Sequence, residues 1–280
     1  TTHDYFLACP NGGFFNYPKN KICHLPPLSA KCIMTNCDVR SYPQKLWRVS
    51  RQVVQNYIGL MPKGIKNFVA ISDFSKSIIE PFLPKDAKFY RIDNPIDVSR
   101  NEPVSVYKNN AFVYIGRLSR EKGPYLFAKA ASILGLESVF VGDGPLRSEI
   151  SDIFPSSAIT GWLSRIEVNN ILNTARALVF PSFCYETQGL VVLEAAAKGV
   201  PAIVPDTSAA RDFVMDGVTG MWFKCGDLDD LIDKMRILQD VDIAKKMGLA
   251  AYERYWQSPS TMDAHVKQLE ECYKNILELD

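Results

Sequence analysis

From residue 111 onward the sequence alternates short apolar runs with amphipathic segments, and this alternation limits the possible folds more than any other feature. The apolar runs are mostly continuous, as in parallel strands that are buried on both faces. The segments between them carry apolar residues three and four positions apart, which is typical of amphipathic helices. The pattern therefore predicts an α/β domain with a doubly wound parallel sheet. The predicted strands cover residues 111–116, 138–144, 158–162, 177–182, 201–206 and 220–223. The predicted helices cover residues 124–134, 146–154, 165–175, 189–198, 209–216 and 228–238.

The first hundred residues predict a smaller α/β unit with too few strands for a full sheet. His3 and Asp4 resemble the end of a strand, and a polar stretch over 94–103 is typical of a linker. We expect a partial N-terminal domain over 1–104, a complete C-terminal domain over 105–256, and a terminal part over 257–280 that packs back across the domain boundary. The predicted elements outside the C-terminal domain are helices at 46–61, 74–83 and 262–279 and strands at 67–72 and 88–93.

Composition excludes some classes of function and leaves others open. Among 280 residues, 32 Lys and Arg stand against 31 Asp and Glu, so the net charge of +1 gives no indication of nucleic-acid binding. No apolar run reaches membrane-spanning length, and the N-terminus lacks the pattern of a signal peptide. We therefore expect a cytoplasmic protein, with attachment to the cytoplasmic face of a membrane through an amphipathic surface left open.

Four cysteines, Cys9, Cys23, Cys32 and Cys37, cluster in a Pro-rich segment near the N-terminus. Four thiols in one segment would suffice for a structural zinc ion, although their spacing is not that of the standard zinc modules. Reduced, partly buried thiols are the alternative. The sequence leaves the choice between them open.

A pair of glutamates, Glu186 and Glu194, flanks and enters the apolar helix predicted over 189–198. Backbone N–H groups and the positive end of the helix dipole meet at Thr187 to Gly189, where a phosphate would bind without a metal. The plainer interpretation is that Glu186 complements the helix dipole and that Glu194 is an ordinary rim residue.

Three further loops follow predicted strands and would face the same crevice as this pair. The first, GRLSREKG from Gly116 to Gly123, offers two cations, Arg117 and Lys122, to a diphosphate. The second is a Gly-Asp-Gly turn at 142–144, and the third is GWLS at 161–164. Each also has a plain interpretation as loop charges, a βα turn or a core tryptophan.

With these four motifs in this order, the chain resembles the retaining glycosyltransferases of the group 1 (family 4) class. The resemblance runs from Phe112 to about Leu238 and extends more weakly to His3-Asp4, Ser72, the Asn94–Asp97 stretch and the terminal helix. It implies a GT-B type α/β fold with one complete Rossmann-like C-terminal domain and a partial Rossmann-like N-terminal domain.

The resemblance also implies roles for individual residues. His3, Glu186, Arg117 and Lys122 would be catalytic, with the two cations neutralising the leaving diphosphate. Glu194 would hold the ribose hydroxyls, and Trp162 with Leu163 would line the base pocket. The complete set expected to bind the donor is Gly116, Arg117, Lys122, Gly142, Gly144, Trp162, Leu163, Thr187, Gly189, Leu190 and Glu194.

The resemblance further implies transfer, with retention, from a UDP- or GDP-sugar to a glycan or lipid-linked acceptor, in surface polysaccharide or lipopolysaccharide synthesis. We expect no cofactor and no metal, because Asp227-Leu228-Asp229 is typical of a helix N-cap rather than of a metal-binding DxD motif. We expect no nucleic-acid partner.

Several features depart from the family pattern. The GRLSREKG motif arrives about a hundred residues early, so the acceptor-side domain is shortened. Gln188 replaces a frequent aromatic residue, and Thr207-Ser208 replaces a common Gly-Gly pair. Two alternatives to a transferase therefore stay open, namely a non-catalytic nucleotide-sugar-binding module or fragment and a GT-B-like sugar-nucleotide epimerase.

Overall fold

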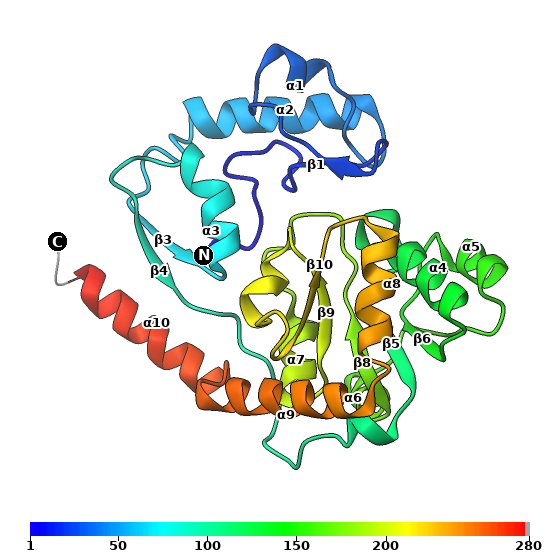
Figure 1. The fold of residues 1–280 in the computed structure, drawn as a ribbon. Helices are drawn as coiled ribbons and strands as arrows, with labels where there is room; N and C mark the ends of the chain where they lie inside the picture. Colours follow the sequence, from blue (N-terminus) through cyan, green and yellow to red (C-terminus); the bar gives the residue numbers. More distant parts are fainter. Residues whose placement is uncertain (278–280) are drawn as a thin grey trace. The chain divides into compact units, whose positions relative to one another are not determined.

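The computed structural model describes residues 1–277 and divides into two compact units (Figure 1). The small unit comprises Thr1–Pro95, Cys184–Gln188 and the chain from Met262 onward, and the large unit comprises Ile96–Phe183 and Gly189–Thr261. These bounds differ from the expected divisions after residues 104 and 256. Hydrogen bonds explain the difference, because Ile96 N donates to Ser260 O (2.8 Å) and Val104 N to Lys198 O (2.8 Å), which ties the expected linker to the large unit.

The large unit contains a six-stranded sheet in which every neighbouring pair of strands is parallel. Its strand order is β10-β9-β8-β5-β6-β7. The strands are β5 (Ala111–Ile115), β6 (Ser138–Val141), β7 (Ala158–Gly161), β8 (Ala175–Val179), β9 (Ala202–Pro205) and β10 (Gly220–Phe223). The chain thus builds one half of the sheet outward from β5 and then returns to build the other half from β8.

Helices connect these strands and cover the sheet. They are η2 (Val106–Lys108), η3 (Arg120–Lys122), α4 (Pro124–Leu134), α5 (Arg147–Ile153), α6 (Arg165–Asn173), α7 (Leu190–Ala197), η4 (Ala209–Phe213), α8 (Leu228–Ile237) and α9 (Val241–Gln257). Helix α4 packs against α5 and α8, while α7 packs against α9. The core between helices and sheet is apolar and fully closed, with Phe112, Phe127 and Phe140 at 1% exposure or less. The doubly wound parallel sheet is therefore as predicted.

Four elements of the large unit differ most from the expectation, and the first of them, β6, ends at Val141 rather than at residue 144. Strand β8 begins at Ala175 rather than at residue 177, because the buried Arg176 is accommodated by backbone carbonyls, its Nε donating to Asn109 O (2.7 Å). Residues 209–213 form a short 3₁₀ helix instead of a longer helix to 216. Helix α9 was not predicted, because several of its buried positions are small residues (Ala244, Gly248 and Ala251) that give a weak apolar pattern, although the Asp240 side chain caps its N-terminus.

The small unit is built around two parallel strands, β3 (Asn67–Ala70) and β4 (Lys88–Arg91). Thr2 forms an isolated parallel bridge with Ala70, as expected for a strand end next to His3. The remaining elements are β1 (Phe15–Asn16), β2 (Lys21–Ile22), α1 (Ala30–Met34), α2 (Tyr42–Tyr57), α3 (Asp73–Ile79), η1 (Glu80–Phe82) and α10 (Met262–Leu277). The predicted terminal helix ran to residue 279, and its last two residues lie outside the described part.

Helix α10 groups with the small unit, to which the His265 ring is joined through a 2.8 Å contact between Nδ1 and Asp93 O. Helix α2 begins and ends four residues earlier than predicted, because Pro43 suits the first turn of a helix. Over residues 1–277, no helix combines the length and apolar character that crossing a bilayer requires.

Candidate nucleotide-sugar site

The strand order locates the expected binding region of the large unit. The chain winds outward from β5 through β6 to β7 and then crosses to β8 on the other side of β5. In open parallel sheets, ligands bind outside the carboxyl ends of the strands where the winding direction reverses. The loops that follow β5 and β8 therefore flank the site, and these loops carry two of the four motifs.

The loops after β5 and β8 are joined by direct contacts. Phe183 N donates to Glu121 O (2.8 Å), and Ser182 Oγ donates to the same carbonyl (3.3 Å). A side chain at Gly123 would overlap the Pro181 carbonyl oxygen, so only glycine permits this approach. These contacts therefore hold the segment from Gly116 to Gly123 next to the residues that follow the C-terminal end of β8.

Arg117 and Lys122 lie on this fixed loop, as the sequence predicted. Arg117 is exposed, and its side chain has no hydrogen bond or ion pair with any residue of the 1–277 range. Lys122 is half-buried in η3. By contrast, Arg120 of the same loop pairs with Glu149, its Nη2 lying 3.2 Å from Oε1. The Arg117 guanidinium is thus available to an anionic ligand.

The loops after β5 and β6 also interlock, and the predicted glycines make this possible. Gly116 N donates to Val141 O and Leu118 N to Asp143 O, both at 2.9 Å. A Cβ at Gly144 would lie 2.5 Å from Leu118 O, and one at Gly142 would overlap Gly116 O. The absence of a side chain at these glycines allows the two strand-end loops to pack this closely.

The third motif follows β7, where Trp162 and Leu163 have different surroundings. Trp162 is 69% exposed, while Leu163 packs partly against the core. Ser164 then begins α6 with a capping box, in which Ser164 Oγ accepts from Glu167 N (3.3 Å) and Ser164 N donates to Glu167 Oε2 (2.8 Å). The side-chain hydrogen bond to Ser164 lowers the pKa of Glu167.

The fourth motif supplies the start of α7. Gly189 adopts the left-handed conformation (φ 88°) at the N-cap, and no side chain caps the helix. The first backbone N–H groups of a helix have no acceptor within it, so those of Leu190 and Val191 are open to a ligand. The arrangement fits an anion, since the positive end of the helix dipole adds to these donors.

Glu194 lies in the middle of α7 and is half-buried. Burial raises the pKa of its carboxyl, while the positive charges of Arg165 and Lys198 act in the opposite direction. A partly desolvated carboxylate gains most from ligand hydroxyls that donate to it.

The remaining predicted residues, His3, Glu186 and Thr187, belong to the small unit. Thr187 Oγ1 donates to His3 O (3.1 Å), and His3 Nδ1 lies 3.5 Å from Asn94 Nδ2. Glu186 is half-buried, with the Cys184 thiol 3.6 Å from its Oε1. The structure thus brings His3 together with the segment that carries Glu186, although 184 residues separate His3 from Thr187.

Two neighbours of His3 were not predicted as site residues. Asn94 N donates to Gln188 Oε1 (3.3 Å), and Gln188 is 3% exposed. The Gln188 Nε2 group is buried without a hydrogen-bond partner in the described chain. The match of the Asn94–Asp97 stretch to the family pattern was the one sequence signal for Asn94. No local pattern indicated that Gln188 would accept a hydrogen bond from it.

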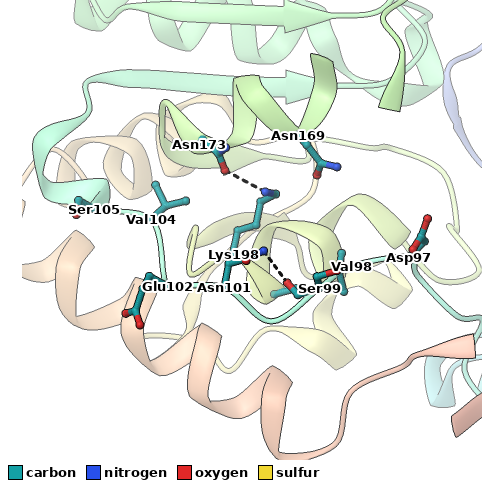
Figure 2. A pocket seen from close by; sticks show the side chains of 11 residues that line it. Asp97, Val98, Ser99, Asn101, Glu102, Val104, Ser105, Asn169, Asn173 and Lys198 are labelled. Atoms are coloured by element: carbon teal, nitrogen blue, oxygen red, sulfur yellow. Dashed lines mark hydrogen bonds between the residues drawn. The ribbon is translucent and has the colours of Figure 1, made fainter. Parts of the chain in front are cut away.

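The large unit also has a cavity of about 510 Å³ that none of the predicted site residues lines (Figure 2). Figure 2 shows the Lys198 side chain reaching toward Asn173, with Nζ 2.9 Å from Oδ1. The cavity lies between α6, the end of α7 and residues 97–105, which is the side of the sheet where strands begin. It is therefore separate from the strand-end loops.

The four clustered cysteines are free thiols, and within residues 1–277 no group of three or more His, Cys, Asp or Glu is arranged to hold a metal ion. Lys45 is fully buried beside them, its Nζ lying 3.6 Å from Cys32 Sγ. Burial raises the pKa of Cys37, against the opposing effect of Lys45.

Comparison with known proteins matches residues 109–240 to the family described as glycosyl transferases group 1. A sulfoquinovosyl transferase (SQD2) of Arabidopsis thaliana is 30% identical over 177 residues, which are 59% of this chain and 34% of that protein. An Escherichia coli UDP-Gal:alpha-D-GlcNAc-diphosphoundecaprenol alpha-1,3-galactosyltransferase is 31% identical over 156 residues, 50% of this chain and 40% of that protein. The chain thus spans well under two thirds of the length of these relatives.

Solved structures share the fold at lower identity. A sucrose-phosphate synthase of Thermosynechococcus elongatus has a TM-score of 0.68 at 20% identity, covering 85% of this chain and 63% of that one. Anabaena Alr3699/HepE in complex with UDP and glucose has a TM-score of 0.67 at 17% identity, covering 82% and 67%. The GT-B type of α/β fold expected from the sequence is thereby confirmed.

Proposed function

We propose that the chain, which matches the group 1 glycosyltransferases over residues 109–240, transfers a sugar from a UDP- or GDP-sugar to an acceptor with retention. The observation that carries this proposal is the joining of the loops after β5 and β8 at the reversal of the winding. The contacts between these two loops support a role for Arg117 and Lys122 in binding a diphosphate at this edge of the sheet.

In this proposal the donor is held by groups that each meet one part of it. The Arg117 guanidinium and the Lys122 ammonium bind the diphosphate, and the N–H groups of Leu190 and Val191 bind the distal phosphate or the sugar. Glu194 accepts from the ribose hydroxyls, and Trp162 with Leu163 contacts the base.

Transfer requires the bond between sugar and phosphate to break, which leaves negative charge on the departing diphosphate. The cations and the helix N-terminus stabilise this charge, and a group of this kind is typically worth about 2–4 kcal/mol in a closed site. The family resemblance assigns Glu186 to the donor sugar and His3 to the reacting sugar. In the Nε2–H tautomer of His3, Nδ1 accepts from Asn94 Nδ2 and Nε2–H remains as a donor.

We propose a lipid-linked acceptor rather than a free glycan. Two hollows of the small unit, of about 290 and 650 Å³, adjoin each other because Pro26 and Phe82 line both. The smaller one reaches Tyr185, which directly precedes Glu186, and is otherwise mostly apolar. A mostly apolar hollow beside Tyr185 suits a lipid chain. The name of the E. coli relative also specifies a lipid-linked diphosphate, GlcNAc-diphosphoundecaprenol. The proposed setting is surface polysaccharide assembly at the cytoplasmic face of a membrane.

The test begins with a thermal-shift screen of UDP-, GDP- and ADP-sugars, since a ligand at 100 times its Kd stabilises by about 2.7 kcal/mol. Transfer of radiolabelled sugar from the selected donor to undecaprenyl-phosphate-linked and free oligosaccharides then identifies the acceptor. If a donor binds and no acceptor receives the sugar, the protein is a nucleotide-sugar-binding module rather than a transferase. Formation of an isomeric donor without acceptor would indicate an epimerase.

Arg117→Ala is expected to lower kcat about 10²- to 10³-fold, because it removes a group that stabilises the leaving diphosphate. The matched control is Arg120→Ala, on the same loop, whose guanidinium already pairs with Glu149. The control should keep activity within about twofold, since exposed ion pairs contribute little. Equal losses in both variants would contradict the role of Arg117.

A further inference from the structure

Helix α2 of the small unit presents its apolar side outward. Its exposed residues are Pro43, Leu46, Trp47, Ser50, Val53, Val54 and Tyr57, none of which is charged. Trp47 is 69% and Tyr57 77% exposed, and the apolar side chains continue beyond the helix with Ile58 at 78%. We call Leu46, Trp47, Val53, Val54, Tyr57 and Ile58 the α2 face. A helix that meets water on its outer side has the opposite pattern.

The inner side of α2 fixes this orientation through polar contacts. Lys45 and Gln52 are both fully buried. Lys45 Nζ contacts Cys32 Sγ, and Gln52 Nε2 donates to Leu7 O (3.2 Å). Rotating the helix to bury the α2 face would break these contacts and leave buried partners unsatisfied. The exposure of the α2 face is therefore built into the packing of the unit.

The segment that contains the α2 face carries charges of almost one sign. Residues 5–72 contain nine Lys and Arg but a single acidic residue, Asp38. Asp38 is 1% exposed and lies 2.6 Å from Arg48 Nε, so its charge is internally compensated. The exposed cations of this segment are Lys19, Lys21, Lys31, Arg40, Lys63 and Lys66.

We propose that the α2 face docks on a lipid bilayer that contains anionic headgroups. Tryptophan and tyrosine favour the membrane interface, aliphatic side chains enter the acyl boundary, and basic residues bind anionic headgroups. A second copy of the chain fits the face poorly, because a symmetric contact would bring two sets of cations together. This membrane docking involves only the small unit, and it is independent of the proposed sugar transfer.

The direct test is co-sedimentation of the full chain with sucrose-loaded vesicles. Vesicles of phosphatidylcholine and phosphatidylglycerol (1:1) should bind the protein about tenfold or more tightly than phosphatidylcholine alone, because the cations need anionic headgroups. Binding should weaken when NaCl rises from 50 to 500 mM, since salt screens the attraction. Equal binding to both vesicle types, or none to either, would overturn the proposal.

A pair of isoleucine variants tests which surface is used. Ile58→Ser should weaken binding about tenfold, because it removes one apolar side chain from the inserted face. The control is Ile166→Ser on α6 of the large unit, where the isoleucine is 74% exposed, and it should bind as the unchanged protein does. Circular dichroism verifies that both variants fold. Equal binding by both would exclude the α2 face.

Sedimentation velocity without lipid separates the membrane from protein partners. The unchanged protein should remain monomeric as its concentration rises. A concentration-dependent dimer that Ile58→Ser abolishes, together with unchanged vesicle binding by that variant, would assign the α2 face to a second copy and overturn the membrane proposal.

Discussion

Glu194 carries both a cost to stability and a proposed role in binding. Burial raises the pKa of its carboxyl, so the folded protein holds this proton at pH values where the unfolded chain, with a pKa of about 4.3, has lost it. In that window the folded state binds more protons than the unfolded state. Stability therefore falls as pH rises from the unfolded value through the folded one, and the loss remains at higher pH.

Glu194→Gln is expected to raise the urea midpoint at pH 7.5, because the amide removes the cost of a buried charge. At pH 4, where the wild-type carboxyl is largely protonated in both states, the difference should be small. The same variant should bind the nucleotide sugar more weakly. Glu253→Gln, at an exposed position of α9, is the control and should change neither quantity. A stability gain of equal size at both pH values would contradict this account.

The site combines residues that have a local sequence signal with residues that have none. Arg117, Gly142 and Gly144 were predicted because each lies in the loop just after an apolar run, and a strand end is a local signal. Gln188 and Asn94 meet across 94 residues of sequence, and neither has a local pattern that indicates the other. Their pairing is set by the packing of the small unit, which only the three-dimensional structure provides.

At the scale of elements, the capping box of α6 holds the helix that follows the Trp162 loop. Ser164→Ala should lower the free energy of unfolding by about 1 kcal/mol, because Glu167 N loses its acceptor. Urea titration measures this change. Ser151→Ala, within α5, is the control and should be neutral or slightly stabilising, since alanine has the better helix propensity. No loss from Ser164→Ala would show that the cap contributes little.

Buried strands were the best predicted elements, because β5, β6 and β9 are continuous apolar runs. Helices with mixed surfaces were predicted less well. The buried positions of α9, among them Ala244, Met247 and Ala251, are separated by charged residues and small side chains. Helix α2 was predicted with shifted bounds. Its orientation was not predicted, because an amphipathic pattern shows that a helix has two different sides but not which side packs against the protein.

At the scale of the whole molecule, the proposed nucleotide site belongs to the large unit. UDP without its sugar should therefore slow amide hydrogen exchange in the large unit, up to about 100-fold at 100 times its Kd for amides that exchange by unfolding of that unit. The strands β3 and β4 of the small unit should exchange at unchanged rates. Mass spectrometry of peptic fragments measures both in one experiment. Equal protection of both units would contradict a site built from the strand-end loops of the large unit.

The small unit is assembled from three separate stretches of sequence, one of which is the five residues Cys184–Gln188 inside the large unit's own span. This has a consequence for how such a gene can be recombined. A single crossover near residue 95 would give a hybrid with the first stretch from one parent and the other two from another. The Thr187–His3 and Gln188–Asn94 hydrogen bonds would then join residues of different ancestry. A functional exchange of this unit between relatives therefore requires all three stretches to be inherited together.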